Sequence, residues 1–269
     1  MYTQIDTQLI LEAVKQTGNI FLPGFKKNIL PTEVTDFKIF LNDIEERCLF
    51  SLKRHIEKAY PAIPWKGDEF DYNEQKQPLD LNEYWLCDSM DGAVQYMQHL
   101  AGWTINLVLI RSGKPYFSVI YDPLSQEMFW AEAGKGAFLN GRRITPSVKT
   151  ELKAMLAVFE YAFPYEKVPG LNKQIGLTVA DMIEHFGCVR NYGPHGLQLA
   201  YVACGRIDVF VQHDLDTYNW LPGILIAQEA GAETINFNEK PWKWGDNSLI
   251  ASPVSIGKKF IQARIANPL

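Results

Sequence analysis

The sequence has little of what marks secreted, membrane-spanning or zinc-binding proteins. Its 269 residues include only four cysteines, far apart and without a CxxC pair, so we expect reduced thiols and neither a disulfide framework nor a zinc site. No apolar run approaches the roughly 18 residues that a transmembrane helix needs. The N-terminus has no basic segment followed by an apolar core, so no secretory signal is expected. These absences predict a cytoplasmic protein that does not enter a membrane.

An excess of basic residues is also missing. The 26 lysines and arginines are outnumbered by 31 aspartates and glutamates, which gives a formal net charge of −5. This balance argues against a broad surface for a nucleic acid polymer, although it is compatible with a local basic pocket. Hydrophobic residues make up 47% of the chain and charged residues 21%, which is ordinary for a globular protein with a substantial core.

Apolar periodicity predicts a mixed α+β protein. Residues 3–24 and 37–60 carry apolar side chains at helical spacing, and residues 71–83 are polar enough for a surface loop. A meander of antiparallel strands is expected next, because the turn dipeptide Asn140-Gly141 closes a series of short apolar runs. The expected strands of this meander are residues 103–110, 116–121, 127–132 and 136–139.

The second half of the chain restarts with alternating strands and helices. Strands are expected at residues 154–159, 188–191, 207–211, 232–236 and 249–251, and helices at 172–186, 197–204, 218–230 and 258–266. No long linker separates the halves. We therefore expect one domain, 1–269, with two lobes at roughly 1–147 and 148–269.

The most informative stretch surrounds two aspartates three residues apart. An apolar segment leads to Asp88, and Asp91-Gly92 then forms a turn before a helix that begins near Ala93. Such a turn can aim two carboxylates at a hard divalent cation, and the first N–H groups of the helix at an anion. The spacing alone is equally compatible with aspartates that cap an ordinary helix.

Neighbouring motifs favour the cation site. Gly67-Asp68-Glu69 follows a short apolar segment about twenty residues before Asp88. With these two acidic motifs, the chain resembles the inositol monophosphatase superfamily of magnesium-dependent, lithium-sensitive phosphatases. The resemblance covers about residues 5–252, and the block Gly134-Lys-Gly-Ala-Phe-Leu-Asn-Gly-Arg-Arg-Ile144 is its most specific part. Further matching segments are 113–123, 200–209, 229–232 and 240–242.

The resemblance implies a layered α-β-α-β-α fold, a homodimer and a phosphatase that acts on a small phosphorylated metabolite such as an inositol, sugar or nucleotide phosphate. It implies two or three Mg²⁺ ions, for which Ca²⁺ or Mn²⁺ could substitute. The implied metal ligands are Asp68 or Glu69, Asp88, the backbone carbonyl of Met90, Asp91 and the residue at position 219, here Asn219. Asp68, Asp88 and Asp91 are also implied in catalysis, together with Glu45, while Gly92, Ala93, His195 and Gln212 would contact the phosphate or substrate.

Several of these positions depart from the family pattern. Ala93 stands where the family has a threonine that helps to activate water, and Asn219 replaces a metal-binding aspartate. Glu45 occupies the place of the water-activating aspartate, with Asp43 as a near alternative. We hypothesise that Asp214 or Asp216 supplies the charge missing at Asn219. The departures leave two hypotheses open, a retuned magnesium-dependent phosphatase and a catalytically weakened relative that binds a phosphorylated ligand in a regulatory role.

Two further substitutions bear on the same pocket. Asp68 replaces a glutamate of the family and is one methylene shorter. The family's Gly-Ser-Ala segment, which lines the substrate pocket, is Gly193-Pro-His-Gly196 in this chain. His195 is therefore the histidine expected in the pocket. A neutral Gln212, where relatives often have an acidic residue, suggests a different polyol or sugar head group.

Overall fold

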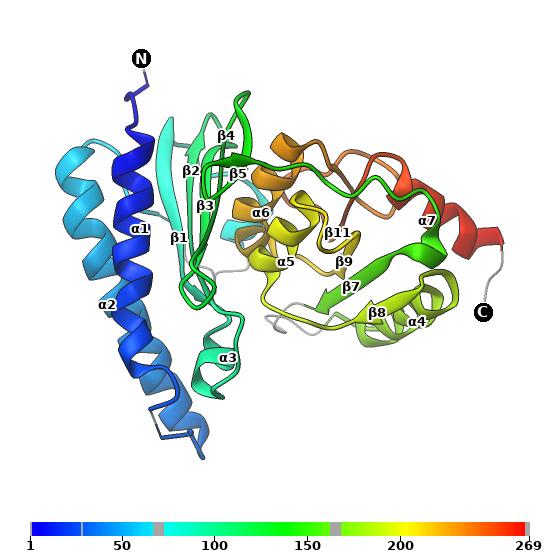
Figure 1. Ribbon diagram of the computed structural model, residues 1–269, viewed down its shortest axis with the longest axis horizontal. Coiled ribbons are helices and arrows are strands. Elements are labelled where there is room, and N and C mark those ends of the chain that lie inside the picture. The colour runs from blue at the N-terminus through cyan, green and yellow to red at the C-terminus, as the bar shows by residue number, and fades with distance from the viewer. Residues whose placement is uncertain (1, 28, 67–72, 162–167, 267–269) are drawn as a thin grey trace.

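Five layers of helices and sheets lie side by side in the protein (Figure 1). The computed structural model describes residues 2–27, 29–66, 73–161 and 168–266. A helix pair covers the outer face of a six-stranded sheet, a second pair lies between this sheet and a five-stranded one, and a third pair covers the far face. This is the predicted α-β-α-β-α arrangement. Within the described residues, no helix is both long and apolar enough to cross a membrane.

The outer helix pair and the first sheet are built by the N-terminal half. The helices are α1 (Thr7–Phe21) and α2 (Val34–Ala59). The sheet is an antiparallel meander in sequence order, as predicted. Its strands are β1 (Glu83–Asp91), β2 (Thr104–Arg111), β3 (Lys114–Asp122), β4 (Glu127–Glu132), β5 (Gly136–Leu139) and β6 (Arg142–Arg143), and the short helix α3 (Ala93–Met97) follows β1.

The second sheet has the strand order β10-β11-β9-β7-β8. Strand β7 runs parallel to β8 and β9, whereas β11 pairs antiparallel with β9 and β10. The strands are β7 (Leu156–Tyr161), β8 (Cys188–Arg190), β9 (Val209–His213), β10 (Glu233–Ile235) and β11 (Ser248–Ser252). The helices of this half are α4 (Leu171–His185), α5 (His195–Ala203), α6 (Thr217–Ala230) and α7 (Ile256–Ala266).

Helices α5 and α6 form the central layer and belong to the hydrophobic core of both sheets. One buried cluster joins Ile120 and Phe129 of the first sheet to Phe210 of the second through apolar side chains of both helices. The two helices approach closely, since a Cβ atom on Gly223 would lie 2.4 Å from the Cβ of Leu199. The central layer thereby fixes where the N-terminal ends of α5 and α6 stand relative to β1.

The family-specific block around the β4–β5 turn is also tied to α6. The carboxylate of Glu229 accepts hydrogen bonds from the N–H groups of Gly134 and Gly136, both at 2.8 Å. Asn140 and Gly141 have φ values of 48° and 77°, which fit the tight hairpin turn predicted for this dipeptide. The block is therefore a hairpin whose start is held by the helix that contributes to the site.

The structure corrects two local predictions. Strand β1 does not end at Asp88 but continues to Asp91, with a shift in its pairing to β2 between these residues. The polar segment before β1 is not simply a surface loop, because it contains a short 3₁₀ helix (Glu74–Lys76) in which Gln75 is fully buried. The carbonyl of Gln75 accepts a hydrogen bond from Thr217 Oγ1 at 2.9 Å, which ties the segment to α6.

Candidate active site

The turn at the end of β1 has the conformation that its sequence predicts. Oδ1 of Asp88 accepts a hydrogen bond from the N–H of Met90 at 3.2 Å. The side chain of Met90 packs into the hydrophobic core between the first sheet and helices α1 and α2. Gly92 precedes α3 with a φ of 87°, and a Cβ atom there would lie 2.6 Å from the carbonyl oxygen of Gly102. Only glycine fits this position without strain. Asp88 and Asp91 therefore lie on either side of a shift in the pairing of β1, and the bend at Gly92 leads from Asp91 into Ala93.

Asp91 is buried and firmly oriented. Its Oδ2 accepts hydrogen bonds from the backbone N–H of Gly196 at 2.7 Å and from the amide of Asn106 at 3.0 Å. Thr104 orients that amide by donating to its oxygen at 2.8 Å. A Cβ atom on Gly196 would lie 3.0 Å from Asp91 Oδ2, which explains the glycine. The carboxylate is thus fixed by β2 and by the start of α5.

His195 lies between two carboxylates. Its Nδ1 is 3.9 Å from Asp91 Oδ1, and its Nε2 is 3.3 Å from Asp216 Oδ2. Burial lowers the pKa of His195, but Asp216 and Asp91 outweigh it and raise the pKa to about 9 from the ordinary 6.5. Near neutral pH the imidazole therefore carries a positive charge in this site.

Asp216 is the centre of a buried polar network at the start of α6. Its side chain is 1% exposed, and its Oδ1 accepts a hydrogen bond from the Asn219 amide at 2.7 Å. Its Oδ2 accepts one from the Gln212 amide at 2.8 Å. Gln212 in turn accepts from the indole of Trp220 at 2.8 Å. Gln212 and Asn219 therefore direct their N–H groups at Asp216.

Glu160, which was not among the predicted site residues, anchors the loop before α5. Its buried Oε1 accepts hydrogen bonds from the N–H of Gly193 and from the amide of Gln198, both at 2.8 Å, and Oε2 accepts from Asn191 at 3.2 Å. The only available signal was a carboxylate within the apolar strand β7. Glu160 thus holds the backbone from which His195 projects.

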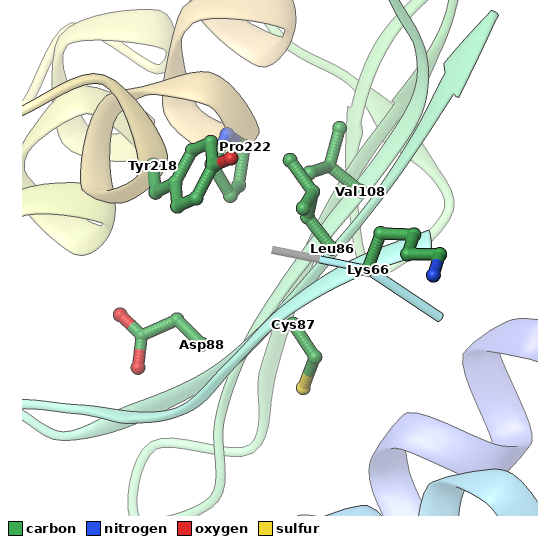
Figure 2. A pocket seen from close by; sticks show the side chains of 7 residues that line it. All are labelled: Lys66, Leu86, Cys87, Asp88, Val108, Tyr218 and Pro222. Atoms are coloured by element: carbon green, nitrogen blue, oxygen red, sulfur yellow. The ribbon is translucent and has the colours of Figure 1, made fainter. Parts of the chain in front are cut away.

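Asp88 lines a small pocket where the end of β1 faces the start of α6. Figure 2 shows Asp88 and Leu86 on the side of the sheet toward α6, whereas Cys87 points toward α2. Tyr218 and Pro222 of α6 form the opposite wall. The remaining lining residues are Lys66 and Val108. This pocket is the space next to the predicted metal-binding turn.

The structure brings some of the predicted site residues together and leaves others apart. Asp91, His195, Gln212 and Asn219 meet in one polar cluster, joined by Asp216. Asp214 Oδ1 accepts a hydrogen bond from the N–H of Leu215 at 2.8 Å. Of the two aspartates hypothesised to supply charge near position 219, Asp216 contacts the Asn219 amide directly.

Glu45 and its alternative Asp43 lie apart from this cluster. Glu45 is exposed on α2, and no hydrogen bond or ion pair joins it to the other described residues. The alternative, Asp43, is also exposed and pairs with Arg47 at 3.1 Å. Asp68 and Glu69 lie outside the described residues.

The surroundings of Asp91 and Asn219 do not fit a second divalent cation. Mg²⁺ needs several oxygen ligands at about 2.1 Å. Here Asp91 Oδ2 receives two N–H groups, Asn219 turns its own N–H group toward Asp216, and the His195 ring lies between the two aspartates. Over the described ranges, no three histidine, cysteine or acidic side chains cluster as a cation site. This conclusion does not extend to a cation at Asp88, for which the expected further ligands are Asp68 and Glu69.

Comparison with known proteins identifies the class to which this fold and site belong. The model of the inositol monophosphatase family matches residues 6–268. Among solved structures, the inositol monophosphatase of Anabaena (Nostoc) sp. PCC 7120 superposes with a TM-score of 0.78 at 22% identity, covering 97% of this chain and 95% of the other. The extragenic suppressor protein suhB of Bartonella henselae superposes with a TM-score of 0.78 at 21% identity, covering 97% and 98%.

The chain belongs to the inositol monophosphatase family. It is 29% identical to the inositol-1-monophosphatase of Caulobacter vibrioides over 196 residues, which is 72% of this chain and 73% of that protein. It is also 25% identical to the Nus factor SuhB of Pseudomonas aeruginosa over 230 residues, which is 85% and 84% of the two chains. The family resemblance inferred from the acidic turn and the hairpin block is therefore confirmed.

Proposed function

We propose that this protein is a phosphomonoester hydrolase that acts on a small phosphorylated metabolite with the help of a divalent cation near Asp88. The observation that carries the proposal is the meeting of the β1 turn with the starts of α5 and α6. Asp88 lines the pocket between β1 and α6, and Asp91 is held by hydrogen bonds 2.7 and 3.0 Å long. Family membership supports phosphatase chemistry at this place.

In this proposal, carboxylates would bind the cation, and N–H groups and His195 would face the phosphate. A divalent cation bound by Asp88, with Asp68 or Glu69, would act as a Lewis acid and lower the pKa of bound water. The N–H groups of Gly92 and Ala93, at the start of α3, would bind phosphate oxygens. His195 is 19% exposed and would add a positive charge near the phosphate.

The substrate is proposed only by class. Inositol, sugar and nucleotide phosphates all share the phosphomonoester that the turn would bind. Gln212 was predicted to contact the substrate, yet both polar ends of its side chain have protein partners, Asp216 and Trp220. We therefore propose that selectivity resides in the loop that carries His195. A homodimer is part of the same proposal.

Release of inorganic phosphate tests the proposal directly. The protein is incubated with a panel of inositol, sugar and nucleotide phosphates, with Mg²⁺ or with a chelator. We expect Mg²⁺-dependent release from at least one substrate and a loss of at least about 100-fold in Asp88→Asn, since even outer-shell partners of a metal cost 10–100-fold. Asp80→Asn, at an exposed aspartate, is the matched control. No release above the Asp88→Asn level from any substrate would contradict the proposal.

A second candidate function is binding without hydrolysis. Ala93 lacks the hydroxyl that relatives use to activate water, and loss of such a group costs about 10²–10⁴ in rate. The relatives named Nus factor SuhB are consistent with roles beyond catalysis in this family. The same panel discriminates the two functions. A phosphorylated ligand that raises the melting temperature but releases no phosphate would support binding alone, and turnover by the unmodified protein would reject it.

A further inference from the structure

The space between Asp91 and the start of α6 is filled by protein groups. The imidazole of His195 bridges it, with one ring nitrogen 3.9 Å from Asp91 and the other 3.3 Å from Asp216. On the far side, the amide of Asn219 donates to Asp216 at 2.7 Å. Nitrogen groups therefore face both carboxylates where the family resemblance places a second cation.

The ring is held in this space by its backbone. The N–H of Gly196, the next residue, donates to Asp91 at 2.7 Å. Two residues earlier in the loop, the N–H of Gly193 donates to buried Glu160 at 2.8 Å. His195 thus projects from a segment fixed on both sides. A cation could enter only if the ring rotated out of the space between Asp91 and Asp216.

The carboxylate oxygens of Asp91 and Asp216 already accept hydrogen bonds from protein N–H groups. Asp91 Oδ2, an oxygen that a cation in place of the ring could use, already accepts two hydrogen bonds. Asp216 likewise accepts one N–H group on each oxygen. A cation that took these carboxylate oxygens would leave buried N–H groups without their acceptors.

We propose that the side chains of His195 and Asn219 take the place of the second cation, so that the protein binds one divalent ion fewer than these positions would otherwise hold. The inference concerns only the cation between Asp91 and Asp216, and it rests on the proposed function for the ion at Asp88. It predicts that the count of bound ions rises by one when both side chains are changed together.

Counting bound Mn²⁺ tests this inference without any activity assay. Free Mn²⁺ is measured by electron paramagnetic resonance in titrations of the full chain. We expect the same number of bound Mn²⁺ ions per chain in the wild type and in Asn219→Asp, and one more in the double variant His195→Ala with Asn219→Asp. His185→Ala, at a half-buried histidine of the outer helix α4, is the control and should bind as the wild type does. Thermal unfolding shows whether each variant is folded.

Each outcome has a distinct meaning. A higher count in Asn219→Asp than in the wild type would overturn the inference, because His195 would then not exclude the ion. A folded double variant without an additional ion would also overturn it. Should the double variant not fold, His195→Ser with Asn219→Asp replaces it, and the comparison of the wild type with Asn219→Asp still decides. No ion in the wild type but one in the double variant would contradict the proposed cation at Asp88 and leave this inference standing.

Discussion

At the scale of single residues, His213 shows a buried histidine whose role is structural. It lies at the end of β9, stacks on Phe237 with ring centroids 4.2 Å apart and contacts Thr178 Oγ1 at 2.9 Å. Burial, together with the charge of Arg264, lowers its pKa to about 4. In the folded protein His213 is therefore neutral over most of the acid range, unlike His195.

This difference in pKa predicts a dependence of stability on pH. The unfolded chain takes up a proton at His213 below about pH 6.5, while the folded protein does so only near pH 4. The free energy of unfolding should thus fall as the pH falls through this window, by about 2 kcal/mol between pH 7 and pH 5. Urea unfolding of the wild type and of His213→Gln measures the contribution. In the variant, the free energy of unfolding should fall less steeply between pH 7 and pH 5. The same pH dependence in both proteins would contradict the prediction.

The residues of the site were predictable to the extent that they act through sequence-local turns. The turn at Asp91-Gly92 and the helix that begins at Ala93 are as their sequence indicates, although β1 continues past Asp88. The direction of the Asn219 amide depends on Asp216, and the position of His195 depends on Glu160. The contact of Glu160 joins segments that are far apart in the sequence, and the contact of Asp216 determines which end of the Asn219 amide faces it. No periodicity in the sequence specifies either contact.

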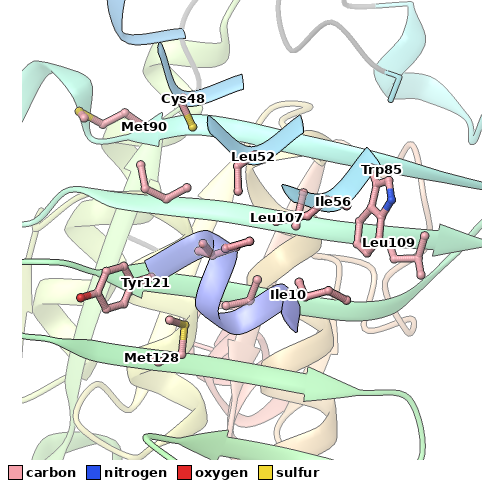
Figure 3. Packing of buried hydrophobic residues seen from close by; sticks show 14 of the residues in the cluster. Ile10, Cys48, Leu52, Ile56, Trp85, Met90, Leu107, Leu109, Tyr121 and Met128 are labelled. Carbon is pink, nitrogen blue, oxygen red and sulfur yellow. The ribbon is translucent and has the colours of Figure 1, made fainter. Parts of the chain in front are cut away.

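At the scale of secondary structure elements, apolar spacing was sufficient to predict the outer layer. The apolar faces of α1 and α2 pack on the first sheet, where Ile10, Leu52 and Ile56 lie against Leu107 and Leu109 (Figure 3). A helical or an alternating period places the apolar side chains on the one face of the helix or strand that is buried, so the period predicts the type of element. The buried 3₁₀ turn before β1 carries no such period, and its contacts with α6 help to order it.

The link between the hairpin block and α6 gives a prediction at this scale. Glu229 accepts two N–H groups of the β4–β5 turn, and hydrogen bonds to a charged acceptor are worth about 1.5–3 kcal/mol each. The Gly134 donor is exposed, so water can replace the lost acceptor there. We therefore expect Glu229→Ala to lower the free energy of unfolding by about 2 kcal/mol in total. Urea denaturation measures it, with Glu184→Ala on the exposed face of α4 as control. Equal effects of the two substitutions would show that the link is unimportant.

At the scale of the whole molecule, the central layer decides whether the two sheets behave as one unit. The buried cluster around α5 and α6 contains side chains from both sheets. A core shared in this way couples the unfolding of its parts, which favours the expected single two-lobed domain over two independent ones. Because α5 and α6 also carry His195 and Asp216, loosening of this layer would separate the site from the β1 turn.

Two helical glycines offer a matched test of this coupling. A Cβ atom on Gly223 would lie 2.4 Å from Leu199 Cβ, whereas one on Gly176 of α4 would meet nothing within 4 Å. Gly223→Ala should therefore destabilise by about 1–3 kcal/mol through overpacking, and Gly176→Ala should stabilise by about 0.5–1 kcal/mol. Circular dichroism and tryptophan fluorescence should report one shared transition, shifted down in the first variant and up in the second. Separate transitions for the two probes in Gly223→Ala would mean that the lobes unfold independently.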